Sequence, residues 1–270
     1  MALFWLRAAV VLYGVAALAV LPAVLYARPG WRHVAVPAAV CGALFHFVAV
    51  VETFSLAHRA LPVDTHETLS LLGLVLALAF LVLAWRWHTV SFGVFLLPAA
   101  AVLALLPAFR PGHELLAYST VGHGWILLHV ALLMAAYAAL LLSLLAGVLY
   151  LLQERRLKSK RRGGQGWLPP LETTDQISLR ALLFGLPCMT AGLLIGCGVA
   201  MATTGPQFFS DPKVLLSFAM WIAYILMIFI RRREGLRGRR AVLLSSTAFV
   251  LVLAVWGANL LSSVHRFKAP

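Results

Sequence analysis

The chain has 270 residues, of which 62% are hydrophobic and 11% charged, which excludes a soluble domain of ordinary composition. Its formal net charge of +13 is explained by basic loops that fix the orientation of a membrane protein. We exclude nucleic acid as a partner, because the basic runs carry no interleaved aromatic residues. The apolar runs are continuous over about 20 residues, which predicts helices that span a lipid bilayer.

We therefore predict an all-α polytopic membrane protein that forms one integral membrane domain, residues 1–270. Its spans, about eight in number, are expected at residues 5–27, 33–56, 68–87, 90–109, 122–152, 178–203, 213–231 and 241–264. The first run has one early charge, Arg7, and no clear cleavage site, so we expect it to be retained. The fifth run is too long for a single crossing and should extend as a helix into a basic loop.

The distribution of Lys and Arg predicts the orientation of the chain. Of the 22 Lys and Arg residues, most lie at one set of span ends, which the positive-inside rule assigns to the cytoplasm. The opposite ends carry the others: Arg7, Arg59, Arg110, Lys213, Arg266 and Lys268. Both termini are then expected to face outward.

Polar residues mark the start of the sixth span. Pro169 and Pro170 forbid the continuation of a preceding helix, and Thr173 or Thr174 is expected to cap the new one. The three cysteines form no Cys-x-x-Cys pair and all lie in apolar stretches, so we interpret them as packing residues.

Two histidines are the leading candidates for chemistry. His129 lies near the start of the fifth span, and His265 follows the last one, so both are predicted at outward ends. Imidazoles are scarce at membrane depth, and a pair from two helices could bind one haem iron between them. The alternative is two unrelated interfacial histidines, and spacing alone does not decide between them.

A short aromatic segment between the sixth and seventh spans is predicted on the same side. Phe208 and Phe209 could lie against a porphyrin face, and Lys213 could pair with its propionates. In the alternative interpretation, the aromatic pair anchors the chain at the membrane interface and Asp211-Pro212 starts the seventh helix.

His46 is predicted well inside the second span. It is either the ligand of a second, deeper haem or a histidine that is hydrogen-bonded to a neighbouring helix, and the sequence leaves both open. The remaining histidines fall at interfaces or in loops, where solvated side chains are expected.

Three stretches together resemble the cytochrome c assembly family of membrane proteins (CcsA-, ResC- and HemX-like). They are Trp125–Val130 with Tyr137, Pro169–Glu172, and the series from Asp211-Pro212-Lys213 through Glu234–Arg240 to His265. The resemblance implies that His129 and His265 flank a haem-presenting segment that ends at Asp211-Pro212-Lys213. Phe208 and Ser210 stand where this family has tryptophans, and Val214 replaces a glutamate, which is closest to the HemX/YpjD-like branch.

The resemblance implies a bacterial inner-membrane protein of cytochrome c assembly or haem handling. Non-covalent b-type haem is the expected cofactor, with His129, His265 and His46 as iron ligands and Phe208, Phe209 and Asp211 around the site. The lipid bilayer and an assembly or haem-synthesis protein are the expected partners. We interpret the chain as a haem carrier or assembly factor rather than a complete haem lyase.

Other functions remain open from the sequence. The first is a non-catalytic membrane factor that regulates haem synthesis or envelope function, in which the haem site is vestigial and the cofactor absent. The second is a small-molecule transporter, for which Glu52 and His46 are the main intramembrane ionisable groups. A quinone-dependent redox enzyme is a more distant alternative.

Overall fold

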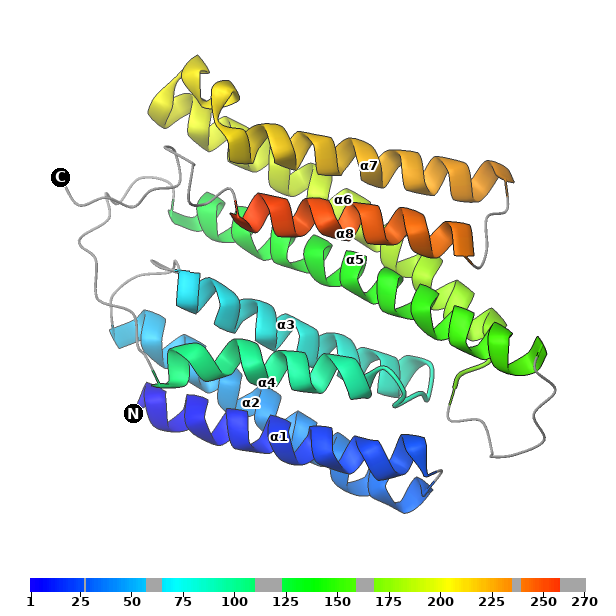
Figure 1. Cartoon of the computed structure of the whole chain (residues 1–270). Coiled ribbons are helices and arrows are strands. Elements are labelled where there is room, and N and C mark those ends of the chain that lie inside the picture. Colours follow the sequence, from blue (N-terminus) through cyan, green and yellow to red (C-terminus); the bar gives the residue numbers. More distant parts are fainter. Residues whose placement is uncertain (27, 57–64, 110–122, 159–167, 235–238, 258–270) are drawn as a thin grey trace. The chain divides into compact units, whose positions relative to one another are not determined.

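The structure is a computed structural model, which describes residues 1–26, 28–56, 65–109, 123–158, 168–234 and 239–257. Within these ranges the regular structure is entirely helical, which confirms the predicted all-α class (Figure 1). The α-helices are α1 (Ala2–Leu25), α2 (Arg32–Leu56), α3 (Thr65–Arg86), α4 (Gly93–Phe109), α5 (His123–Lys158), α6 (Leu171–Thr204), α7 (Pro212–Glu234) and α8 (Arg239–Gly257). Two short 3-10 helices, η1 (Pro29–Trp31) and η2 (Pro206–Ser210), precede α2 and α7.

Six of the described helices are long and apolar enough to cross a membrane: α1, α2, α3, α5, α6 and α7. Helix α4 is also apolar but has 17 residues. The helical form follows from the apolar solvent, because a helix satisfies its own backbone N–H and C=O groups where no water is available. The chain is therefore a multi-span membrane protein.

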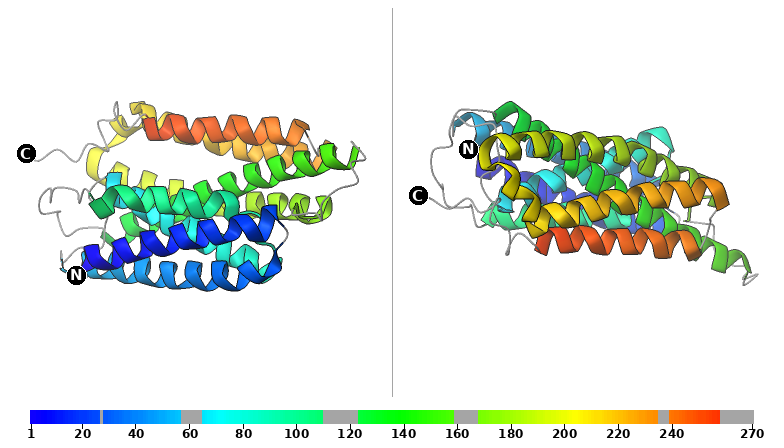
Figure 2. Two further views of the ribbon diagram at one scale, coloured as in Figure 1. Left: turned by 60° about the horizontal axis from the view of Figure 1, so that its bottom comes forward. Right: turned by 90° about the horizontal axis from the view of Figure 1, so that it is seen from above.

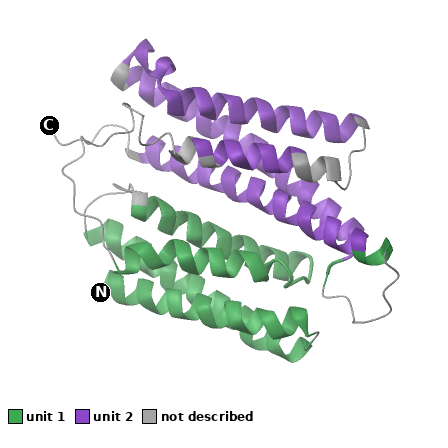
Figure 3. Cartoon of the chain, viewed as in Figure 1, with its two compact units in different colours: residues 1–115, 156–169 green, residues 116–155, 170–270 purple. Residues whose placement is uncertain are grey.

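The chain divides into two compact units, which we describe separately (Figure 3). Unit 1 comprises residues 1–115 and 156–169, and unit 2 comprises residues 116–155 and 170–270. The expectation of one integral membrane domain over residues 1–270 stays a prediction.

Small residues bring the helices of unit 1 together. In α1 the buried positions Ala9, Ala16 and Ala19 recur at helical spacing, and Ala35, Ala39, Ala43 and Ala49 do the same in α2. Gly42 lies so close to the Tyr13 ring that an added Cβ would stand 2.9 Å from it. Small side chains let membrane helices approach closely and pack by van der Waals contact, and α1 and α2 pack side by side in this way (Figure 2).

Unit 2 consists of α5 to α8 with η2. The N-terminal end of α5, the C-terminal end of α6, η2 and the C-terminal end of α8 lie at one end of this unit (Figure 1). We call it the η2 end. It contains His129, and the orientation predicted from the basic residues places it outward.

The helix boundaries agree with the predicted spans to a few residues, except at the start of α6 and the end of α5. The predicted end of the last span, at residue 264, lies outside the described residues. Helix α6 begins at Leu171 rather than near residue 178, directly after Pro170. The expected cap by Thr173 or Thr174 is wrong. The Thr174 hydroxyl instead donates to the backbone oxygens of Pro170 and Leu171, at 3.2 and 2.9 Å, from within the first turns. Helix α5 has 36 residues, which confirms the expected extension beyond one crossing.

Candidate functional site at the η2 end of unit 2

His129 is held against α6 by a short hydrogen bond. Its Nδ1 lies 2.6 Å from the backbone oxygen of Gly192. A carbonyl oxygen can only accept, so Nδ1 must carry the proton and donate it. The remaining nitrogen, Nε2, then has a free electron pair, and it has no hydrogen bond to another residue of the described chain. An imidazole fixed in this way by a backbone carbonyl has the usual arrangement of a metal-binding histidine.

Two glycines of α6 make room for this ring. An added Cβ on Gly196 would collide with the His129 imidazole, and one on Gly192 would come within 2.9 Å of Leu133. The sequence carried a signal for this contact, because Gly192 and Gly196 form a Gly-x-x-x-Gly motif, which is typical of close helix packing in membranes. This motif is not among the features that predicted the site.

The aromatic pair of the predicted site lies in η2. Phe208 is buried, whereas Phe209 is 48% exposed. Their ring centroids are 4.1 Å apart, and Phe209 also stacks on Phe218 of α7 at 6.4 Å. The pair therefore provides one buried aromatic ring and one accessible ring at the same end as His129.

Asp211 marks the start of α7, which was the alternative interpretation of this residue in the sequence. Its Oδ1 accepts the backbone N–H of Lys213 at 2.9 Å, and its backbone oxygen accepts the N–H of Leu215 at 3.1 Å. These are the bonds of a helix N-cap, and Pro212 occupies the first position of α7, where a missing N–H costs nothing. This geometry favours capping over contact with a cofactor.

A cation lies at the same end of unit 2 as the candidate ligand. Lys213 is on the first turn of α7. A lysine at this position is suited to pair with the carboxylate of a ligand bound at Nε2.

His265 lies outside the described residues. The structure therefore gives no distance between its ring and that of His129. The last described residue of α8 is Gly257, and that end of α8 lies at the η2 end (Figure 1). The partnership between the two histidines stays a prediction.

His46 is fully buried in unit 1, with both ring nitrogens in hydrogen bonds. The Tyr13 hydroxyl lies 3.3 Å from Nδ1, and the Ser70 hydroxyl lies 2.8 Å from Nε2. This arrangement favours the hydrogen-bonded histidine over the deeper haem ligand, because a ring with two satisfied nitrogens must lose one bond before it can ligate iron.

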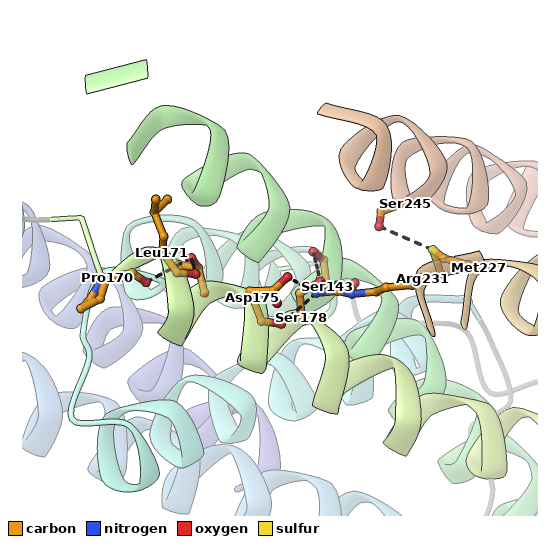
Figure 4. Close-up of polar contacts among 9 residues, drawn as sticks. Ser143, Pro170, Leu171, Asp175, Ser178, Met227, Arg231 and Ser245 are labelled. Carbon is orange, nitrogen blue, oxygen red and sulfur yellow. Dashed lines mark hydrogen bonds and ion pairs between the residues drawn. The ribbon is translucent and has the colours of Figure 1, made fainter. Parts of the chain in front are cut away.

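The other end of unit 2 contains a polar network that the sequence analysis did not identify (Figure 4). Arg231 of α7 donates to the Asp175 carboxylate at 2.6 Å and to the Ser178 hydroxyl at 2.6 Å. Ser178 lies 2.9 Å from the Ser143 hydroxyl of α5. Arg231 is also one of the basic residues from which the orientation is predicted. The network joins α5, α6 and α7.

The residues at the η2 end fit haem binding. The site offers one oriented imidazole with a free Nε2, aromatic rings and a cation, and a haem iron needs only one or two protein ligands. In the parts of the chain that the structure describes, no three His, Cys, Asp or Glu residues gather as a metal site.

Comparison with known proteins identifies the relatives of this chain. The family described as cytochrome C assembly protein matches residues 38–265. The cytochrome c biogenesis protein CcsA of Prochlorococcus marinus (strain AS9601) is 31% identical over 203 residues, which cover 66% of this chain and 62% of that protein. The inner membrane protein YpjD of Escherichia coli (strain K12) is 27% identical over 264 residues, which cover 95% of this chain and 97% of YpjD.

The two relatives differ in how much of their own length the chain matches. The aligned region is about 62% of the length of the CcsA protein, whereas nearly all of YpjD is matched. No solved structure matches this chain.

Proposed function

We propose, from the premise that this chain belongs to the cytochrome c assembly protein family, that it binds non-covalent haem and acts in cytochrome c assembly or haem handling. His129 provides one axial ligand through Nε2, and His265 the other. Phe209, the exposed ring of the pair, contacts the porphyrin with Phe208 packed behind it, and Lys213 pairs with a propionate. The similarity to YpjD, which is named an inner membrane protein, supports the bacterial inner membrane as the location.

The observation that carries the proposal is the hydrogen bond from His129 Nδ1 to the Gly192 oxygen. It fixes the tautomer, so that the free electron pair of the ring is on Nε2. Bound haem would supply iron to that nitrogen, and the chain would hold the cofactor at a predicted outward end, beside the compartment where c-type cytochromes mature. His46 is left out of this site, because Tyr13 and Ser70 occupy both of its nitrogens.

The test is an optical spectrum of the full-length protein, purified in detergent from haem-replete cells. We expect a Soret band in the wild type, a weakened and shifted band in His129→Ala, and none in the double variant His129→Ala, His265→Ala. His33→Ala is the matched control, because His33 is exposed at the start of α2 and should leave the spectrum unchanged.

A colourless wild-type protein that also fails to bind added haemin would contradict the proposal. It would favour the non-catalytic membrane factor with a vestigial site. A Soret band that survives in the double variant would instead place the haem elsewhere in the chain.

A further inference from the structure

Unit 1 contains a hollow whose lining residues are distant in sequence from those proposed to bind haem. The hollow has a volume of about 380 Å³ and lies between α2 and α3. Its lining residues are Arg32, Val36, Val40, Leu81, Ala84, Trp85 and His88. A volume of this size is within the range of about 300–1,000 Å³ that small-molecule sites occupy.

The lining residues form one continuous face on each helix. Arg32, Val36 and Val40 follow each other every four residues along α2, so they stand in line on one side of that helix. From Arg32 to Val40 the row spans on the order of 12 Å at 1.5 Å per residue. The hollow is therefore an apolar groove with a cation at one end.

The polar end of the groove is built by the ends of the two helices. Arg32 is the first residue of α2, and His88 follows the last turn of α3. His88 has a φ of 51°, in the left-handed region that a non-glycine residue rarely adopts, and this turn brings its side chain back to the groove. Arg32 and His88 are both exposed, and Arg32 has no ion-pair partner among the described residues.

The apolar part of the groove is open to the surface of the unit. Trp85 is 79% exposed, and Val40 is 39% exposed. Arg28, Arg32 and Arg86 belong to the set of basic residues that the positive-inside rule assigns to the cytoplasm, and tryptophan is enriched at the level of the headgroups. The groove thus lies where the chain is expected to meet the anionic inner leaflet.

We propose that this groove binds one anionic glycerophospholipid. Its phosphate pairs with Arg32 beside His88, and the first part of an acyl chain lies along Val36, Val40 and Leu81, with Trp85 against it. Charge complementarity selects this occupant, since basic pockets between membrane helices on the cytoplasmic side suit anionic headgroups. A zwitterionic headgroup also carries a phosphate, but its own cationic group would lie beside Arg32 and weaken the pairing. This proposal does not depend on haem binding in unit 2.

The experiment measures lipid binding to the purified full-length protein by native mass spectrometry. The protein in detergent is titrated with dioleoyl phosphatidylglycerol or with dioleoyl phosphatidylcholine, which has the same chains and no net charge. We expect one preferentially retained phosphatidylglycerol. Arg32→Gln should weaken its retention about fivefold, as expected for the loss of one arginine near an anionic surface, and Val40→Trp should weaken it at least as much by filling the groove.

Two control variants leave the groove untouched. Arg232→Gln removes an exposed arginine of α7, also predicted to be cytoplasmic, and Val102→Trp adds the same bulk at an exposed position of α4. Both should bind phosphatidylglycerol as the wild type does. Equal retention of the two lipids would overturn the proposal, and so would Arg32→Gln and Val40→Trp proteins that elute as monodisperse peaks and bind normally. An effect of Arg32→Gln without one of Val40→Trp would also overturn it, because it would mean a surface phosphate contact with no chain in the groove.

Discussion

His129 and His46 are both intramembrane histidines, and their hydrogen bonds separate their roles. His129 has one nitrogen bonded to a backbone oxygen, whereas His46 has both nitrogens engaged by hydroxyl groups. A metal-binding histidine usually has one free nitrogen and one supported nitrogen, and of these two residues His129 has this pattern. Residue type alone could not distinguish the two.

The glycine beneath His129 provides a sharp test at the residue scale. In Gly196→Ala the new Cβ collides with the imidazole, so the ring must move away from its bond to Gly192. We expect haem affinity to fall about 10–100-fold, the range for disturbed supports of metal ligands. Haemin titration of the apoprotein, followed at the Soret band, measures the change.

Gly198→Ala is the control for that variant. No atom lies within 4 Å of the Cβ that it would add, so haem affinity should stay at the wild-type level. Equal affinities for Gly196→Ala and wild type would show that the ring orientation seen here has no part in haem binding.

Replacing His46 tests the structural role of that residue. In His46→Leu the hydroxyl groups of Tyr13 and Ser70 lose their partner inside unit 1. We expect the free energy of unfolding to fall by about 1–3 kcal/mol, the cost of unsatisfied buried polar groups, with unchanged haem per folded protein. Chemical denaturation in detergent and a pyridine haemochrome assay measure the two quantities. A loss of haem without a loss of stability would restore His46 as a ligand.

At the scale of elements, α6 is the helix on which unit 2 is organised. One end presents Gly192 and Gly196 to His129, and the other presents Asp175 and Ser178 to Arg231. Between them, Trp221 of α7 donates to the Thr190 hydroxyl at 2.9 Å. These polar contacts, spread along the length of α6, fix how α5 and α7 align with it. Apolar packing alone would specify that alignment weakly in lipid.

The Arg231 network predicts a difference between neighbouring arginines. The side chain of Arg231 is 9% exposed and that of Asp175 20%, whereas Arg232 is exposed. Arg231→Gln leaves the carboxylate without its guanidinium, and we expect a loss of about 2–3 kcal/mol, below the 3–5 kcal/mol of fully buried pairs. Arg232→Gln should cost less than about 0.5 kcal/mol. Thermal unfolding in detergent compares them, and equal midpoints would contradict the structural role of the network.

At the scale of the whole molecule, orientation decides what the η2 end can do. The distribution of Lys and Arg predicts that both termini and the η2 end face outward. A haem bound at His129 would then be accessible from the periplasm, and the groove at Arg32 would meet the inner leaflet. Both proposals share this orientation, although their ligands and units differ.

Reporter fusions test the orientation directly. Alkaline phosphatase, which is active only after export, should be active when joined after residue 270 and inactive when inserted in residues 159–167. Green fluorescent protein at the same two places should give the opposite pattern. Phosphatase activity at 159–167 would reverse the orientation and move the candidate haem site to the cytoplasmic side.

The sequence alone determined the class, the helices and the family of this protein. Runs of apolar residues near 20 in length predict spans because backbone groups in lipid must be satisfied within the helix. Both boundaries of α2 and the start of α5 agree closely with the predictions. The motifs around His129 and Asp211 also indicated the family, because a series of short motifs in a fixed order can be recognised without a structure.

Only the tertiary structure decided the roles of the polar residues. His129 and Gly192 are 63 residues apart, and Arg231 and Asp175 are 56 apart. The Gly192/Gly196 motif predicts a close helix neighbour for α6, but no local pattern identifies the partner of either side chain. The same holds for His46, whose two partners come from α1 and α3. The physical reason is that helix formation depends on neighbours in the chain, whereas the use of an imidazole or a guanidinium depends on which polar atoms other helices bring to it.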